Sequence, residues 1–346
     1  MISVADTFIR RRRALPVALL LGLLLAACSS PPAEPVRFSG MTMGTTWIVQ
    51  VSQLPETVSN EDLNADIETL LEQVNDEMST WRENSDISRF NRLPAGESLE
   101  IPHGFVSVLS LSLELAEQSG GAFDPTVGPL VNLWGFGPEG RVSQAPDEES
   151  LAATRQRVGY QRLAFDPQSH SLTQPGGLYL DFSSIAKGWG VDVVAEHLIE
   201  LGIEGFLVDI GGDMRMQGAR PDGKGWRIAI ERPVPGTREI FQIIQPGNAA
   251  IATSGTYRQY FESGERRYSH TIDPRTGFPV EHPAISITVI ADNATRADGL
   301  ATALGVLDPD EGYEWAIERN LAVLWILESG NELNERYTPG FAPLLD

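Results

Sequence analysis

The chain has 346 residues, of which 47 are acidic and 26 are basic, and its formal net charge is −21. This balance argues against a nucleic-acid partner, because no basic patch remains outside the N-terminal segment. The single cysteine, Cys28, excludes an internal disulfide and a metal site built from several cysteines. An anionic ligand would have to be neutralised locally, since charges are screened over about 8 Å at physiological salt.

Residues 1–27 are typical of a secretory signal peptide. Four arginines precede an apolar run over 14–25, which is shorter than the ~20 residues of a membrane span. The run ends in Leu-Ala-Ala-Cys28, the lipobox pattern of bacterial lipoproteins. We therefore expect Cys28 to be acylated, palmitate included, and to anchor the protein to a bacterial membrane, facing the periplasm. Residues 28–38 are predicted to form a flexible linker, and 39–346 the folded region.

The first half of the folded region is predicted to alternate strand, helix and loop. A strand over 43–51 follows a glycine turn. Two amphipathic helices are expected over 62–78 and 103–118, where apolar side chains recur at helical spacing. A loop with two prolines and a carboxylate covers 122–130.

Strand signals dominate beyond residue 160. We expect strands over 161–165, 177–182, 205–210, 226–231, 240–244 and 285–290. The helices expected between and after them cover 184–200, 294–306 and 310–319. Because hairpins join most of these strands, the predicted class is α+β, with mixed, largely antiparallel sheets packed with helices. Gly211-Gly212 does not fit G-x-G-x-x-G, which argues against a Rossmann domain.

The segment from Asp181 to Asp192 is predicted to be a turn from a strand into a helix. Such a turn directs free backbone N–H groups and the positive end of the helix dipole at one point, which suits an anion. Lys187 would add a full positive charge, and Gly188 and Gly190 would allow another surface to approach. Taken alone, the segment is more typical of a capped helix packed on a sheet, with an exposed lysine.

Two further segments carry candidate chemistry. Asp298 and Thr302 are four residues apart on a predicted helix, so their oxygens share one face and suit Mg²⁺; alternatively, they are a solvated aspartate and a threonine bonded to its own helix. His270 lies between a strand end and a turn that begins at Asp273, where an imidazole beside a carboxylate can act as a general base. The alternative for this loop is a plain turn.

Together these segments resemble the ApbE-like FAD:protein FMN transferases. The motifs that carry the resemblance run in order along the chain: Met43-Gly-Thr, Ser79-Thr-Trp81, Ala122-Phe-Asp124-Pro-Thr126, 181–190, Asp209-Ile-Gly-Gly-Asp213, Thr253-Ser-Gly255, 270–277 and 298–302. The resemblance implies a T-fold-like α+β domain that binds FAD with Mg²⁺. It also implies transfer of FMN to a threonine or serine of a membrane-associated acceptor, such as a subunit of a membrane redox complex, with release of AMP.

The resemblance also implies roles for individual residues. Those expected to bind FAD are Met43, Trp81, Ala122, Phe123, Asp124, Asp181, Lys187, Ser254, Gly255 and His270. Those expected to hold Mg²⁺ are Asp298 and Thr302, with a third ligand from Ser184 or the Ala186 carbonyl. His270 would take the proton of the acceptor hydroxyl, and Asp273 is the second candidate for this general base. Trp81 stands where many relatives have tyrosine, and Lys187 is not lysine in every relative.

Two other functions are compatible with the same residues. An FAD pyrophosphatase would use the same site with water as the acceptor and would release free FMN and AMP. A flavin-binding or solute-binding lipoprotein would hold its ligand without turnover. Supplying FAD and Mg²⁺ without an acceptor protein would separate the hydrolase from the transferase.

Overall fold

The structure is a computed structural model that describes residues 34–345 except 143, 235, 237–238, 257–259, 264–265 and 331. The signal peptide and Cys28 lie outside the described residues. From Pro35 the chain forms one compact unit. Its first strand, β1 (Val36–Thr42), begins inside the segment predicted as linker, three residues before the expected start of the fold. None of the helices in the described part of the chain combines the length and apolar character needed to cross a bilayer.

An eight-stranded sheet is the centre of the unit, and every neighbouring pair in it is antiparallel. Its strands, in spatial order, are β1, β2 (Thr45–Val51), β6 (Phe206–Ile210), β7 (Asp213–Gln217), β10 (Ala249–Gly255), β13 (Ala284–Ala291), β14 (Ala322–Ser329) and β15 (Glu332–Tyr337). The β6–β7 hairpin turns at Gly211 and Gly212, both at positive φ, as a two-residue hairpin turn requires. The predicted α+β class and antiparallel pairing are confirmed.

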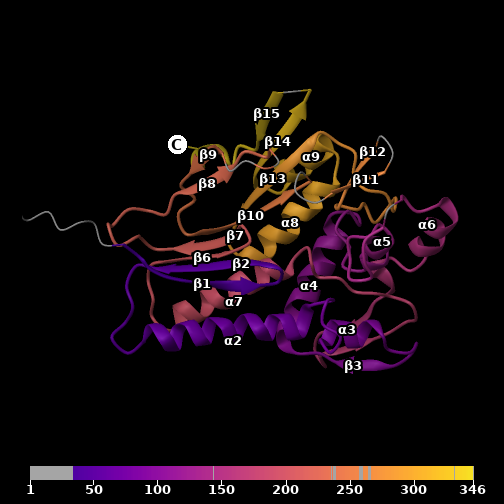
Figure 1. Ribbon diagram of the computed structural model, residues 1–346, viewed down its shortest axis with the longest axis horizontal. Coiled ribbons are helices and arrows are strands. Elements are labelled where there is room, and N and C mark those ends of the chain that lie inside the picture. Colours follow the sequence, from indigo (N-terminus) through magenta and orange to yellow (C-terminus); the bar gives the residue numbers. More distant parts are fainter. Residues whose placement is uncertain are drawn as a thin grey trace, which may run out of the picture. The chain divides into compact units, whose positions relative to one another are not determined.

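Helices cover one face of this sheet (Figure 1). They are α2 (Asn60–Met78), α7 (Ala186–Glu200) and α8 (Ala294–Val306). Side chains alternate along each strand, so Val208 packs on the helices while its neighbour Leu207 packs on the opposite face. That second face is covered by β8 (Ile228–Glu231), β9 (Ile240–Ile244) and a short 3₁₀ turn near the C-terminus.

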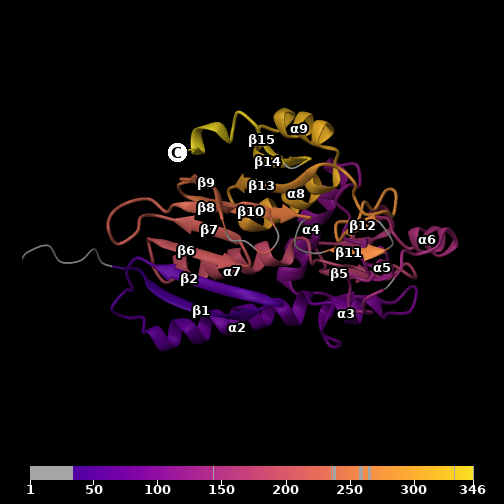
Figure 2. The same cartoon turned by 45° about the horizontal axis from the view of Figure 1, so that its top comes forward.

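Most of the remaining elements gather beside the ends of α2 and α8 (Figure 2). They are α3 (Asp86–Asn91), α4 (His103–Gln118), α5 (Gly128–Leu133), α6 (Glu148–Arg155), the 3₁₀ turn Tyr160–Arg162, the three-stranded sheet of β3 (Ser98–Glu100), β5 (Ser171–Thr173) and β4 (Ala164–Asp166), and the hairpin of β11 (Tyr260–Ser263) and β12 (Arg266–Ser269). Helix α9 (Pro309–Glu318) follows α8 and packs on β14.

The strand predicted over 177–182 is not formed. Leu180 is fully buried there, as its apolar character suggests, but its backbone N–H and C=O pair with the side-chain amide of Asn91, at 2.7 and 2.9 Å. The N–H of Asp181 donates to the carbonyl of Pro125 at 2.8 Å. Side chains and a loop therefore satisfy backbone groups that a neighbouring strand would otherwise have bonded.

Candidate functional site

The candidate site is built where the start of α7 touches α8. A Cβ atom on Gly188 would lie 2.3 Å from the carbonyl oxygen of Ala294, so the two backbones are in contact. The N–H of Gly188 donates to Oδ2 of Asp298 at 3.1 Å. A glycine without a side chain therefore brings the Asp298 carboxylate to the first turn of α7.

Replacing Gly188 by alanine should lower the free energy of unfolding by about 1–3 kcal/mol, because the added methyl group meets backbone atoms that cannot move aside cheaply. Chemical denaturation would measure the change. Gly225→Ala is the matched control, since Gly225 is exposed and its Cβ would meet no atom within 4 Å. Equal stability of the two variants would contradict the close contact between α7 and α8.

Lys187 is not the exposed lysine of the simpler interpretation. Its ammonium forms an ion pair with Asp213, at the start of β7, and lies 3.8 Å from Oδ2 of Asp298. Burial alone would lower the pKa of Lys187, but these two carboxylates raise it above its ordinary value. Burial, and then the charge of Asp213, raises the pKa of Asp298 to about 7. The cluster thus holds two buried carboxylates and one cation.

The metal ligands expected from the sequence converge beside this cluster. The hydroxyl of Thr302 donates to the carbonyl oxygen of Ser184 at 3.3 Å, and Asp298 is one helical turn before Thr302 on α8. Ala186 is the first residue of α7, between Ser184 and Lys187. A carboxylate, a hydroxyl and a main-chain carbonyl are all hard oxygen donors. These residues fit Mg²⁺, which takes few protein ligands and completes its shell with water and phosphate oxygens.

Asp124 and Asp181 lie in two loops that the structure joins through the bond from Asp181 to Pro125. Both carboxylates are buried and bonded within the protein. Asp124 accepts from the N–H and hydroxyl of Thr126, at 2.8 and 2.6 Å, and Asp181 accepts from the N–H of Ser183 at 2.8 Å. Burial raises the pKa of each. In this structure, the two carboxylates stabilise the conformations of the loops that carry them.

Ala122 and Phe123 are only 1% exposed, so neither presents a surface to a ligand in this structure. The N–H of Phe123 is also taken by the hydroxyl of Ser119 at 3.0 Å. Contact of these two residues with FAD stays a prediction, and it would require the loop to open.

Trp81 follows the end of α2 and is 70% exposed, an unusual position for a large aromatic side chain. The ring of Trp81 is therefore accessible for stacking on a planar ligand.

Met43 occupies the β1–β2 turn at a φ of +48° and packs against Gly190 of α7. A hydrogen bond of 2.9 Å from Asn75 to Thr42 connects this turn to α2.

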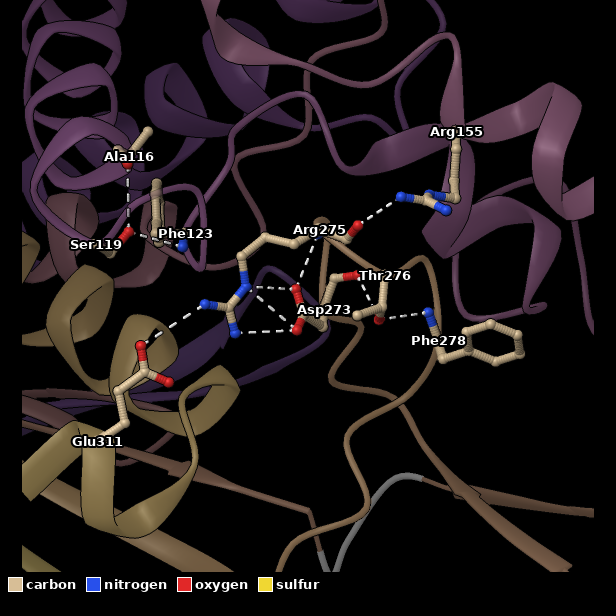
Figure 3. Close-up of polar contacts among 9 residues, drawn as sticks. All are labelled: Ala116, Ser119, Phe123, Arg155, Asp273, Arg275, Thr276, Phe278 and Glu311. Carbon is tan, nitrogen blue, oxygen red and sulfur yellow. Dashed lines mark hydrogen bonds and ion pairs between the residues drawn. The ribbon is translucent and has the colours of Figure 1, made fainter.

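His270 directly follows β12, and its ring forms a T-shaped pair with the Phe136 ring, with 6.3 Å between centroids. Asp273, three residues on, accepts from both the backbone and the guanidinium of Arg275, at 2.8 to 3.3 Å (Figure 3). Asp273 therefore anchors Arg275, and its proposed part in proton transfer stays a prediction.

Three other elements hold this loop in place. The indole N–H of Trp134 donates to the carbonyl of Gly277 at 2.8 Å. Arg155 of α6 donates to the carbonyl of Arg275 at 2.7 Å, and the Arg275 guanidinium lies 4.0 Å from Glu311 of α9 (Figure 3). The loop that carries His270 is thus fixed by contacts from distant parts of the chain.

Ser254 and Gly255 end β10 and are half-buried. The Ser254 hydroxyl lies near Gly305, 3.1 Å from the position of a Cβ there, which places it beside the end of α8. Sequence reasoning assigned no role to Asp213 or Asp192, both of which are buried at the α7–α8 junction. A signal existed for Asp213, since it is an acidic residue directly after a buried strand and a glycine pair.

Residues 43–325 match the model of the ApbE family. The chain is 45% identical over 329 residues to the FAD:protein FMN transferase of Vibrio cholerae, which covers 95% of this chain and 98% of that protein. It is 40% identical over 336 residues to the enzyme of the same name from Haemophilus influenzae, covering 95% and 97%.

Solved structures give the same result. The flavin transferase ApbE from Vibrio cholerae superimposes with a TM-score of 0.84 at 44% identity, covering 91% of this chain and all of that one. The apo form of the flavinyl transferase ApbE from Pseudomonas stutzeri has a TM-score of 0.83 at 39% identity, covering 90% and 97%. The fold is therefore shared along almost the whole chain.

Proposed function

Because this chain belongs to the ApbE family, we propose that it is an FAD:protein FMN transferase that requires Mg²⁺. The observation that carries the proposal is that two residues one turn apart on α8 meet the start of α7: Asp298 accepts from the N–H of Gly188, and Thr302 donates to the Ser184 carbonyl. This arrangement offers oxygen ligands to a cation beside a helix N-terminus. In so acidic a protein, a bound cation and a helix N-terminus would neutralise the negative charge of a pyrophosphate.

In the proposed reaction, the hydroxyl oxygen of an acceptor threonine or serine forms a bond to the phosphorus of the FMN half. The bond from that phosphorus to the AMP oxygen breaks, and AMP leaves with the electron pair. His270 takes the proton of the attacking hydroxyl. When bound, Mg²⁺ would supply charge stabilisation at the phosphate oxygens.

The chain's own residues supply binding and orientation. Asp298, Thr302 and the Ser184 carbonyl would hold the cation, with Ala186 as a neighbouring carbonyl. Lys187 is ion-paired with Asp213, so its ammonium is held in a fixed position beside these ligands. The exposed ring of Trp81 would stack on a ring of FAD.

The direct test mixes the purified protein with FAD, Mg²⁺ and a candidate acceptor domain from a membrane redox complex. A fluorescent acceptor band on a denaturing gel, with equimolar AMP, is the expected result. Free FMN and AMP without an acceptor would instead favour the pyrophosphatase. Tight FAD binding with neither product would favour a flavin-binding protein without catalytic activity.

We also propose that Cys28 anchors the protein by lipid to a bacterial membrane, facing the periplasm. A protein that begins at Pro31 should be soluble and keep full transfer activity in vitro, because the compact unit starts only at Pro35. Cys28→Ser in the full chain should move the protein from the membrane fraction to the soluble fraction. A shortened protein that is folded but inactive would show that the linker contributes to the site.

A further inference from the structure

A buried carboxylate on α7, that of Asp192, bonds to the N-terminus of α8. Its Oδ1 accepts from the N–H of Ala294 at 2.9 Å, and its Oδ2 accepts from the N–H and hydroxyl of Thr295 at 2.8 and 2.5 Å. Asp192 and Thr295 are only 6% and 5% exposed. The two N–H groups lie in the first turn of α8, where no intrahelical partner exists for them, and a negative charge there is favoured by the helix dipole.

Arg215 of β7 completes this junction. Its guanidinium lies 3.1 Å from Oδ1 of Asp192 and 2.7 Å from Glu196, on the next turn of α7. A buried charge is thereby paired and hydrogen-bonded on every side, which is the condition under which a buried carboxylate is tolerated. The junction fixes α7, α8 and β7 to one another.

The position of this junction relative to the site gives it a role beyond stability. Thr295 precedes Asp298 by three residues on α8, and Asp192 follows Gly188 by four on α7. One helical turn in each helix therefore separates the junction from the contact between Gly188 and Asp298. A shift of α8 along α7 would move Asp298 away from Gly188 and Thr302 away from the Ser184 carbonyl.

We infer that Asp192 and Thr295 are positioning residues that set the spacing of the Mg²⁺ ligands on α8 relative to the start of α7. The inference rests on the proposed function for the identity of the metal. Groups that orient metal ligands typically change metal affinity by 10- to 100-fold when they are altered. Such residues change the affinity for the metal and do not take part in the reaction, so excess Mg²⁺ should restore the rate of a variant.

The test measures Mg²⁺ binding to the full chain by titration calorimetry, with Mg²⁺ alone as the probe. Asp192→Asn and Thr295→Val should weaken binding by roughly 10- to 100-fold. Both should raise the Mg²⁺ concentration for half-maximal transfer by a similar factor, with kcat near normal at saturating Mg²⁺. Thr295→Ser keeps the hydroxyl and should keep normal affinity.

Thr338→Val is the control for a purely structural effect. Thr338 is 1% exposed, and its hydroxyl makes two hydrogen bonds, at 2.6 and 3.0 Å, far from α7 and α8 in the chain. It should lower Tm without changing Mg²⁺ affinity. Normal Mg²⁺ affinity in a folded Asp192→Asn protein would overturn the inference, as would an equal loss of affinity in Thr338→Val. Absence of Mg²⁺ binding by the unaltered protein would overturn the metal assignment itself, together with this role.

Discussion

Replacing His270 by asparagine should reduce the rate of FMN transfer by ~10²–10⁴-fold, while the affinity for FAD stays close to normal. The acceptor hydroxyl is a poor nucleophile until its proton is removed, and asparagine cannot remove it. His270 follows β12, whereas the proposed metal ligands lie just before α7, on α7 and on α8. Nine of the ten residues expected to bind FAD also lie elsewhere in the chain, so loss of the imidazole should change FAD affinity little.

Transfer would be followed by acceptor fluorescence and FAD binding by calorimetry. His170→Asn is a suitable control, because His170 adopts a φ of +51°, which asparagine tolerates better than most residues. A His270→Asn protein with a nearly normal rate would show that another group is the base, and Asp273→Asn would be measured next. Joint loss of affinity and rate would make His270 a binding residue.

The long helices could be predicted from sequence because local periodicity determines them. The intervals predicted for α4 and α8 agree with the structure at both ends, and the interval predicted for α2 begins two residues late. The strand predicted over 177–182 failed for a physical reason. Its apolar residues are indeed buried, but Asn91 and the carbonyl of Pro125, both distant in the chain, bond its backbone. No local pattern could reveal those partners.

In the candidate site, too, local features could be predicted from the sequence and long-range contacts could not. The spacing of Asp298 and Thr302 predicted a shared helix face, and the structure agrees. The ion pair of Lys187 with Asp213 joins residues 26 apart, and the bond from Gly188 to Asp298 spans 110. Such contacts depend on which strands and helices become neighbours. The family resemblance identified the segments, but it did not reveal that Asp273 holds Arg275 or that Asp192 anchors α8.

Replacing Asp298 by asparagine should abolish most of the Mg²⁺-dependent activity while the fold survives. The amide keeps the shape of the side chain and can still accept from Gly188, but it lacks the charge that holds a divalent cation. Metal-ion catalysis supplies several kcal/mol, so the loss should be roughly 100-fold or more. Since burial raises the pKa of Asp298 to about 7, a neutral side chain is well tolerated at this position.

The measurement compares transfer rate, Mg²⁺ binding and Tm for Asp298→Asn, Asp292→Asn and Thr302→Val. Asp292→Asn makes the same change of charge as Asp298→Asn, but at an exposed position just before α8. It should leave the rate, the Mg²⁺ affinity and Tm unchanged. Thr302→Val removes the hydroxyl that faces the Ser184 carbonyl, and it should weaken Mg²⁺ binding less than Asp298→Asn does, because a neutral ligand contributes less than a charged one. Removal of the metal from the unaltered protein with a chelator should reproduce the Asp298→Asn rate. Turnover that persists in the chelator, or an Asp298→Asn protein that binds Mg²⁺ normally, would place the metal elsewhere.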